Sequence, residues 1–329
     1  MQSWHRRDFL NRSACAMAAL PLLAHANTER VRIAELKMVP HAALDADERG
    51  FVAGLAKGGF TQGQNLHIER FDAQGNTQQL KQMAQHISQS KFDLIHTIST
   101  LPTQHILAHV KYTPVVFSSV TDPQFAEIIP QQLFQDAPHR SNMTGVSDQW
   151  PVDLQFHVYA SLVPHAKVWG TLYNPAEANS VIHLQRMQAT AHARGVQLLE
   201  AQVHHPDQVK QAALSLVPRV QAVTITSDNT SSARIEDLAT VCNAYQRPLF
   251  AGDIDSVERG AVAAYGLNYF LVGYAAGRKA ALILQGVSAG DLPWTRIDKF
   301  SLALNLKAAQ LQGVELSASV QARAHRILR

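Results

Sequence analysis

Residues 92–103 of the chain are FDLIHTISTLPT, a short apolar run followed by a polar one. The segment 92–98 is rich in Leu, Ile and Phe, and it has the length of a buried strand. Residues 99–103 carry three hydroxyl side chains and lead into the next helix. A strand that passes through a polar loop into a helix is the repeating unit of a parallel α/β sheet. This stretch therefore predicts an α/β fold with a polar edge at the carboxyl end of its sheet.

The segments around this stretch alternate between strand and helix in the same way. In the first half we expect strands at 31–36, 66–71, 92–98 and 114–117, and helices at 44–56 and 78–87. In the second half we expect strands at 167–173, 195–199, 222–226 and 248–251, and helices at 176–193 and 206–216. Because the same order occurs twice, the sequence predicts an internal duplication, with helices on both faces of two parallel sheets.

Polar loops stand at matched positions in the two halves. The loop 99–103 has its counterpart at 227–230, and the loop 121–123 has its counterpart at 253–256. Parallel sheets bind ligands beyond the carboxyl ends of their strands, so two facing sheets would bring these loops together in one cleft. The alternative is that the halves share only an α/β pattern, in which Ser, Thr, Asp and Asn side chains cap helices.

The composition of the 329-residue chain narrows its function. Hydrophobic residues make up 46% and charged residues 17%, which favours a large folded core and argues against disorder. The net charge of +3, without a basic run interleaved with aromatics, argues against a nucleic-acid-binding protein. The two cysteines, Cys15 and Cys242, exclude a disulfide scaffold and a thiolate-rich zinc site.

The sequence also lacks the common catalytic motifs. We find no nucleophile elbow, zinc-protease, phosphate-loop or dinucleotide signature. The sixteen histidines show no metal-ligand spacing, and the adjacent His204 and His205 would face opposite ways in a strand. We therefore expect no catalytic residue, no metal and no cofactor.

Residues 1–26 have the pattern of an export signal. Arg6-Arg7 precedes an apolar run from Ala14 to Leu23, and Ala24-His25-Ala26 supplies small residues for cleavage, so the mature chain should begin near Asn27. The Arg pair followed by Asp8-Phe9-Leu10 favours the twin-arginine route, and an ordinary Sec signal is the alternative. Since the apolar run is shorter than the roughly 20 residues that span a bilayer, and no later segment is long enough, we expect a soluble periplasmic protein.

Several stretches, taken in order, resemble one protein family. They are His41–Asp45, Glu48–Phe51, Gly59–Asn65, Thr121–Pro123, Asn142–Ser147, Tyr173–Ser180, Thr226–Thr230, Ser256–Ala261 and Leu304–Gly313. At these residues the chain is similar to ABC-transporter substrate-binding proteins of the tryptophan/tyrosine type. The resemblance implies a type I periplasmic-binding-protein fold, in which two Rossmann-like α/β lobes with parallel sheets are joined by a hinge and close on a ligand.

The resemblance also implies where the lobes begin and end. The N-terminal lobe would comprise residues 27–147 and 268–290, and the C-terminal lobe residues 148–267 and 291–329. The chain would cross between the lobes near 146–152, 265–268 and 292–299.

The candidate ligand contacts come from the polar loops and from the crossovers. Ser99 and Thr100 stand at a helix start, where a ligand carboxylate is well placed. Asp228 would accept an ammonium group, with Asn229 orienting it. The full set is His41, Ser99, Thr100, Thr103, Thr121, Asp122, Tyr173, Asn174, Glu177, Ser180, Asp228, Asn229, Asp253 and Tyr269. For Ser99, Thr100 and Asp228 the alternative is a capping role, and Tyr269 can simply pack.

These observations favour a periplasmic solute-binding protein of an ABC importer. Its cargo would be a small polar molecule, with amino acids, including aromatic ones, as the leading candidates. We expect a monomer that contacts the inner-membrane permease transiently and binds no nucleic acid. One alternative is a ligand sensor that presents its closed form to a membrane receptor. A remote alternative is an exported hydrolase or isomerase using Asp122, Asp228 or Asp253 as acid or base.

Overall fold

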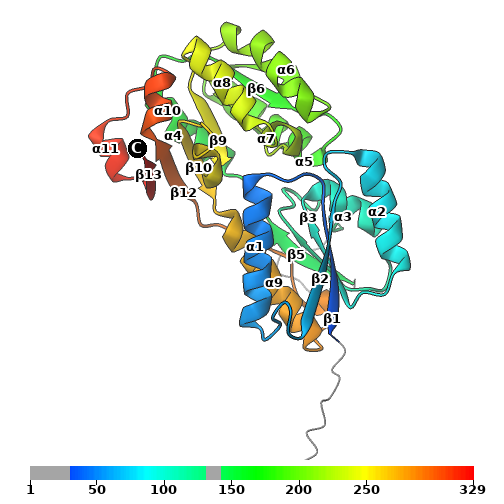
Figure 1. The fold of residues 1–329 in the computed structure, drawn as a ribbon. Coiled ribbons are helices and arrows are strands. Elements are labelled where there is room, and N and C mark those ends of the chain that lie inside the picture. The colour runs from blue at the N-terminus through cyan, green and yellow to red at the C-terminus, as the bar shows by residue number, and fades with distance from the viewer. Residues whose placement is uncertain (1–29, 131–141) are drawn as a thin grey trace, which may run out of the picture.

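Two mainly parallel sheets organise the chain, each in its own lobe (Figure 1). The computed structural model describes residues 30–130 and 142–329. The expected export signal at 1–26, with its Arg6-Arg7 pair, and the expected mature start at Asn27 lie outside the described residues.

In the part of the chain that the structure describes, the first sheet has six strands in the order β11-β5-β4-β3-β1-β2, and all neighbours pair in parallel. Its strands are β1 (Val31–Lys37), β2 (Leu66–Asp72), β3 (Leu94–Ile98), β4 (Val115–Ser118), β5 (Met143–Ser147) and β11 (Thr295–Arg296). The helices of this lobe are α1 (Ala42–Lys57), α2 (Thr77–Gln89), α3 (Thr100–Leu107) and α9 (Tyr269–Leu284).

The second sheet has seven strands within the described residues, in the order β13-β12-β10-β9-β8-β6-β7, and among these neighbours only the pair β10–β12 is antiparallel. Its strands are β6 (Val168–Tyr173), β7 (Gln197–Gln202), β8 (Ala222–Thr224), β9 (Leu249–Asp253), β10 (Ala263–Leu267), β12 (Ser301–Asn305) and β13 (Arg326–Leu328). The helices of this lobe are α4 (Val152–Leu162), α5 (Ala178–Ala193), α6 (Val209–Leu216), α7 (Asn229–Ser232), α8 (Ile235–Tyr245), α10 (Leu306–Leu311) and α11 (Ala318–Ala322).

The predicted duplication is visible in the strand order. The first sheet contains the run β2-β1-β3-β4-β5 and the second contains β7-β6-β8-β9-β10, which is the same doubly wound order twice. The order reverses between β1 and β3 in the first lobe and between β6 and β8 in the second. Doubly wound sheets form a crevice at such a switch point, just beyond the carboxyl ends of the strands. We therefore expect one crevice at that edge of each sheet.

The chain passes between the lobes three times. It leaves the first sheet after β5, returns after β10 to form α9, and leaves again after β11. These crossings run from β5 to α4, from β10 to α9 and from β11 to β12. The expected lobe boundary at residue 291 is too early, because β11 still pairs with β5 of the first sheet. Two-residue strands such as β11 have too few residues to show an alternating pattern, so the sequence did not reveal it.

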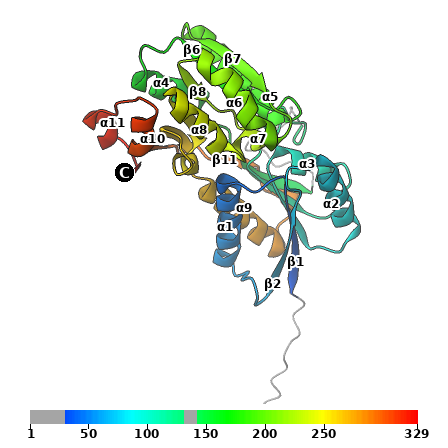
Figure 2. The ribbon, with the colours of Figure 1, turned by 45° about the horizontal axis from the view of Figure 1, so that its top comes forward.

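Helices α1 and α9 pack closely although they are far apart in the sequence (Figures 1 and 2). Glycines four residues apart line the contact on each helix, namely Gly50 and Gly54 on α1, and Gly273 and Gly277 on α9. A Cβ atom on Gly277 would lie 2.1 Å from the carbonyl oxygen of Phe51, so only glycine allows this approach. The packing attaches α9 to the first lobe after the second crossing.

The second lobe has an aromatic core between its sheet and helices. The rings of Tyr159 and Phe250 stack at 4.6 Å, and those of Phe156 and Trp169 stack at 5.0 Å.

Cys242 is buried with a free thiol. Across residues 30–130 and 142–329, no helix is both long and apolar enough to span a bilayer.

Candidate functional site

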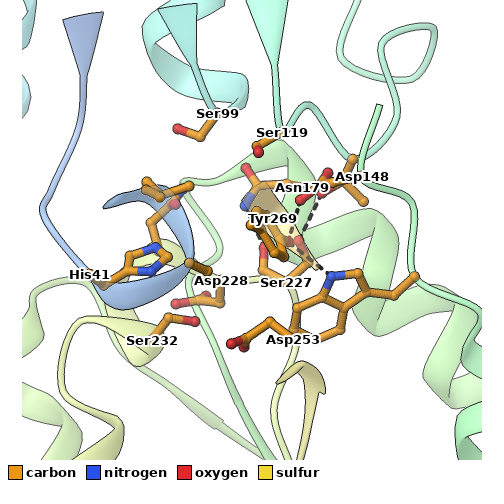
Figure 3. Close-up of a pocket in the computed structure, with 15 residues that line it drawn as sticks. His41, Ser99, Ser119, Asp148, Asn179, Ser227, Asp228, Ser232, Asp253 and Tyr269 are labelled. Atoms are coloured by element: carbon orange, nitrogen blue, oxygen red, sulfur yellow. Dashed lines mark hydrogen bonds between the residues drawn. The ribbon is translucent and has the colours of Figure 1, made fainter. Parts of the chain in front are cut away.

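Loops at the carboxyl ends of both sheets line a small cavity between the lobes (Figure 3). Its volume of about 20 Å³ leaves room for little more than one water molecule. The lining residues are His41, Ala43, Leu44, Ser99, Ser119, Thr121, Asp148, Trp150, Asn179, Ser227, Asp228, Asn229, Ser232, Asp253 and Tyr269. Ser99 and Asp228 thus belong to the same site, as expected from the matched loops.

Two helix N-termini of the first lobe open onto the cavity without a side-chain cap. The residues that precede α1 and α3 are His41 and Ser99, and neither side chain bonds the backbone N–H groups of its helix. The Ser99 hydroxyl is buried and has no hydrogen-bond partner. Uncapped N–H groups and the helix dipole attract negative charge, so this wall favours an anion.

Two serines of this wall have left-handed backbone angles. The φ angle is 80° at Ser99 and 55° at Ser119, which directly follow β3 and β4. Such angles in a residue other than glycine cost about 1–3 kcal/mol and concentrate at functional sites. With these backbone angles, both residues line the cavity at the ends of neighbouring strands.

A buried polar network stands behind Ser119. The Ser119 hydroxyl donates to Asp47, and Ser118 donates to the same carboxylate at 2.8 Å. His96 lies between Ser118 and Glu35, at 2.9 Å from each. Burial raises the pKa of Asp47 to about 7. The network holds Ser119 in position from the interior of the lobe.

The line Ser118–His96–Glu35 resembles a hydrolytic triad, but it lies inside the first lobe. Ser118 is fully buried and donates its hydrogen bond to Asp47, so the hydroxyl is not presented to a substrate. Among the carboxylates of the hydrolase hypothesis, Asp122 does not line the cavity and is paired with Arg186 at 2.6 Å. In the part of the chain that the structure describes, no group of three His, Cys, Asp or Glu side chains is placed to hold a metal ion.

Asp228 dominates the wall formed by the second lobe. Its carboxylate accepts hydrogen bonds from the backbone N–H of Ser231, the backbone N–H of Asn174 and the hydroxyl of Ser180, each at 2.6 Å. Burial and the charge of Glu177 raise the pKa of Asp228 to about 7. Asp228 therefore caps α7 as well as lining the cavity.

Glu177 supports this wall from behind. Its carboxylate accepts from the backbone N–H and side-chain amide of Asn229, at 3.2 and 2.6 Å, and from the backbone N–H and hydroxyl of Thr230, at 3.2 and 2.7 Å. Asn174 also donates to Glu177 and Thr230, at 3.3 and 2.8 Å. These bonds connect the start of α5 to the start of α7 and fix Asn229 at the cavity.

The crossovers form the third side of the cavity. Tyr269, at the second crossover, donates its hydroxyl to Asp148 at 2.5 Å and accepts from the indole N–H of Trp150 at 3.0 Å (Figure 3). Asp148 and Trp150 lie on the first crossover, between β5 and α4. Asp253, at the end of β9, also lines the cavity. Its carboxylate accepts hydrogen bonds from the backbone N–H and the hydroxyl of Ser256, at 2.9 and 2.6 Å.

Two polar contacts join the lobes beside the cavity. The hydroxyls of Thr121 and Ser227 lie 2.8 Å apart, and Arg186 of α5 donates to Asp122 at 2.6 Å. Both contacts require the lobes to be close together.

The structure brings together half of the residues chosen from the sequence. His41, Ser99, Thr121, Asp228, Asn229, Asp253 and Tyr269 line the cavity. The others lie outside its lining, namely Thr100, Thr103, Asp122, Tyr173, Asn174, Glu177 and Ser180. Asn174, Glu177 and Ser180 support the wall, and Thr103 bonds Thr97 at 2.8 Å inside the first lobe. The Tyr173 hydroxyl accepts from Gln202 at 2.9 Å, on the outer strand pair β6–β7.

Six polar or aromatic residues of the lining were not chosen individually from the sequence, although Ser227 belongs to the loop 227–230 that we expected in the cleft. These are Ser119, Asp148, Trp150, Asn179, Ser227 and Ser232. A signal was present for Asp148 and Trp150, because a charged residue and a large aromatic one stood on an expected crossover. Ser119 stood two residues after the expected strand 114–117 and preceded the loop 121–123.

Comparison with known proteins places this geometry in a family. A family model described as ABC transporter substrate binding protein matches residues 32–328. The chain belongs to the ABC transporter substrate-binding protein family. Over 279 residues it is 30% identical to a tyrosine-binding protein of Clostridioides difficile (strain R20291), which covers 84% of this chain and 80% of that protein. The family resemblance expected from the ordered motifs is confirmed.

Two solved structures of similar sequence identity differ in how well they match. An ABC domain from Streptococcus pneumoniae in complex with L-Trp has a TM-score of 0.85 at 25% identity, covering 91% of this chain and 100% of that one. The ligand-free, open structure of a substrate-binding protein with adhesive properties from Clostridium difficile has a TM-score of 0.66 at 28% identity, covering 91% and 99%. The predicted two-lobe fold of the periplasmic binding proteins is confirmed, and the chain matches the complex better than the open form.

Proposed function

We propose that this substrate-binding protein captures an amino acid in the periplasm for an ABC importer, by closing its two lobes over the ligand. The observation that carries the proposal is the opposite polarity of the cavity walls. The first lobe offers uncapped helix N-termini and the unpartnered hydroxyl of Ser99. The second lobe and the crossovers offer the carboxylates of Asp148, Asp228 and Asp253.

This polarity suits a zwitterion. A ligand carboxylate is favoured at the starts of α1 and α3, where backbone N–H groups and helix dipoles converge. A ligand ammonium is favoured on the acidic side, because no Lys or Arg belongs to the described lining of the cavity. An α-amino acid carries both groups on one carbon, so it would bridge the two lobes with one charge on each.

The remaining surface of the cavity supports an aromatic amino acid as cargo. Trp150, Tyr269 and Leu44 bring apolar and aromatic surface to the lining. Aromatic side chains stack and pack against such surfaces with favourable energy. The similar proteins named for tyrosine and solved with L-Trp support the same choice.

Lobe closure is supported by three features. The hydroxyls of Thr121 and Ser227 meet across the lobes, the cavity is almost filled, and the match is better to the L-Trp complex than to the open form. A ligand as large as an amino acid cannot enter this arrangement, so we propose that the lobes separate for loading and close afterwards. The ligand would shift the balance by its greater affinity for the closed state.

The proposal includes export and a membrane partner. The signal at 1–26 would direct the chain to the periplasm by the twin-arginine route, and the closed monomer would dock on a permease. Replacing Arg6-Arg7 by Lys-Lys should abolish this export, as measured by the protease accessibility of the protein in spheroplasts. Unchanged export in cells that lack the twin-arginine translocase would mean that the Sec route is used.

The binding function is tested with the mature protein and a panel of the twenty amino acids. Thermal unfolding identifies the ligand, and calorimetric titration gives its affinity. A ligand at 100 times its Kd should stabilise the protein by about 2.7 kcal/mol. The matching amine and the matching carboxylic acid, each lacking one charge, should bind much more weakly than the amino acid. Absence of stabilisation by every amino acid would refute the proposal. Loss of labelled amino acid uptake on gene deletion would separate import from sensing.

A further inference from the structure

The three carboxylates of the cavity differ in how many donors they already have. Asp228 receives three hydrogen bonds from its own lobe, shared between both oxygens. Asp253 receives one on each oxygen, both from Ser256. Asp148 receives one, from Tyr269 to Oδ2, and its Oδ1 has no partner although the residue is only 3% exposed. The Thr121 hydroxyl lies 2.8 Å from that of Ser227 and also interacts with Asp148, but it does not fill Oδ1.

A buried carboxylate oxygen without a partner is costly, because a charged acceptor loses its hydration and receives nothing in return. Burial accordingly raises the pKa of Asp148, while hydrogen bonding by Tyr269 and Thr121 opposes that rise. The nearby wall offers no cation, since Lys and Arg are missing from the described lining and Arg186 is engaged with Asp122. The open acceptor is therefore available to a cation that arrives with the ligand.

A second open acceptor lines the same cavity. The side-chain oxygen of Asn179 is buried and unpartnered, while its amide nitrogen donates to Glu177 and to the carbonyl of Ser227, at 3.2 and 2.6 Å. These two donations fix the amide with its oxygen free. An ammonium group has three N–H donors, so it can satisfy a charged and a neutral acceptor at once.

We propose that Asp148 is the residue that receives the ligand's ammonium group, with Asn179 as its neutral partner, and that Asp228 mainly builds the wall. This inference rests on the proposed amino-acid function and names the specificity-determining contact of that site. Asp148 lies on the first crossover and is bonded to Tyr269 on the second. The ligand's positive charge would thus be bound at the point where the chain connects the lobes, and not on the face of one lobe alone.

The test compares Asp148→Asn with the wild-type protein by calorimetric titration. The probes are L-tyrosine, or whichever of the twenty amino acids stabilises the wild type most, and its analogue that lacks the amino group. A charge-assisted hydrogen bond corresponds to about 10- to 150-fold in affinity. We expect Asp148→Asn to weaken amino-acid binding by that factor and to change binding of the deaminated analogue by less than about threefold.

Two further variants complete the design. Asp207→Asn is the matched surface control, because Asp207 is exposed and its partners His205 and Arg234 are exposed as well. Asp148→Glu keeps the charge and should retain the preference for the ammonium-bearing ligand, which provides a readout if the Asn variant fails to fold.

The outcomes separate the two proposals. If the wild type binds an amino acid and Asp148→Asn keeps its affinity and its preference over the deaminated analogue, the assignment of Asp148 is wrong while the function stands. The same holds if Asp253→Asn or Asp228→Asn loses that preference and Asp148→Asn does not. If the wild type binds no amino acid, the proposed function itself fails, and the assignment fails with it.

Discussion

Replacing Asp228 by alanine and by asparagine should separate its structural role from its charge. Alanine removes the acceptor of three hydrogen bonds. The backbone N–H of Asn174 keeps a second acceptor, the Ser180 hydroxyl at 3.0 Å, and Ser180 keeps Thr226 at 3.3 Å. The backbone N–H of Ser231 has no such reserve, because Asp228 is its cap. The main loss is therefore one buried N–H at the start of α7.

The magnitude follows from that single donor. A buried N–H left without an acceptor costs about 1–3 kcal/mol. The usual cost of losing an N-cap refers to this same hydrogen bond, so the two values are not added. We expect Asp228→Ala to lower the free energy of unfolding by about 2 kcal/mol. Asparagine keeps an oxygen for Ser231 and offers its amide to the Ser180 hydroxyl, so its loss near pH 6 should stay below about 1 kcal/mol.

The comparison also depends on pH. Burial and the charge of Glu177 raise the pKa of Asp228 to about 7, against 3.8 for the free carboxyl. Between these values the folded state holds a proton that the unfolded state has released, so the contribution of this carboxyl is lost as the pH rises. Asparagine does not titrate. The stability of Asp228→Asn relative to wild type should therefore increase from pH 5 to pH 8.

Urea denaturation without ligand, at pH 5, 6, 7 and 8, measures both effects. The reasoning is refuted if the alanine variant unfolds within about 0.5 kcal/mol of wild type at pH 6. It is also refuted if the relative stability of the asparagine variant falls as the pH rises.

Three further perturbations test other parts of the structure. His183 accepts from the backbone N–H of Ser227 at 2.7 Å, and burial lowers its pKa to about 3. In the unfolded state the pKa of this imidazole returns to about 6.5, so below that pH only the unfolded state takes up the proton. The free energy of unfolding of wild type should therefore fall by about 2 kcal/mol relative to His183→Asn between pH 6.5 and pH 5 in urea melts. Parallel pH profiles of the two proteins would contradict this. Arg186→Gln removes the ion pair with Asp122 between the lobes. The variant should bind the amino acid about two- to fivefold more weakly and should have a larger radius of gyration in X-ray scattering. An unchanged radius and affinity would show that the pair does not hold the lobes together. Gly277→Ala should cost about 1–3 kcal/mol in a denaturant melt, because its Cβ would meet the backbone of α1, and an unchanged midpoint would show that the helices can separate freely.

The fold was largely predictable because its signals are local. A strand such as β6 combines apolar residues with a following Asn-Pro turn, and both features are visible within nine residues, 167–175. The differences are at the ends: the expected strand 222–226 stops at Thr224, where the chain turns toward α7, and the expected strand 92–98 starts at Leu94. The late return to the second lobe after β11 depended on a pairing with β5, about 150 residues earlier, which no local pattern records.

The candidate site was predictable only as a region. Carboxyl ends of parallel strands meet at one edge, so the sequence placed Ser99 and Asp228 near a shared cleft. It did not distinguish a residue on the cavity from one behind it. Glu177 was as good a candidate as Asp228, and its position behind the wall follows from bonds to Asn229 and Thr230, more than 50 residues away. Such partners are determined by tertiary packing.

The sequence by itself determined two duplicated α/β lobes with polar loops at matched strand ends, because period and turn chemistry act over a few residues. Only the tertiary structure decided which charges face each other. It left the starts of α1 and α3 without a side-chain cap, gave Asp228 three donors, and left Asp148 with an open oxygen on the crossover. The physical reason is that a carboxylate's role depends on the donors that reach it, and those donors come from segments that folding alone brings together.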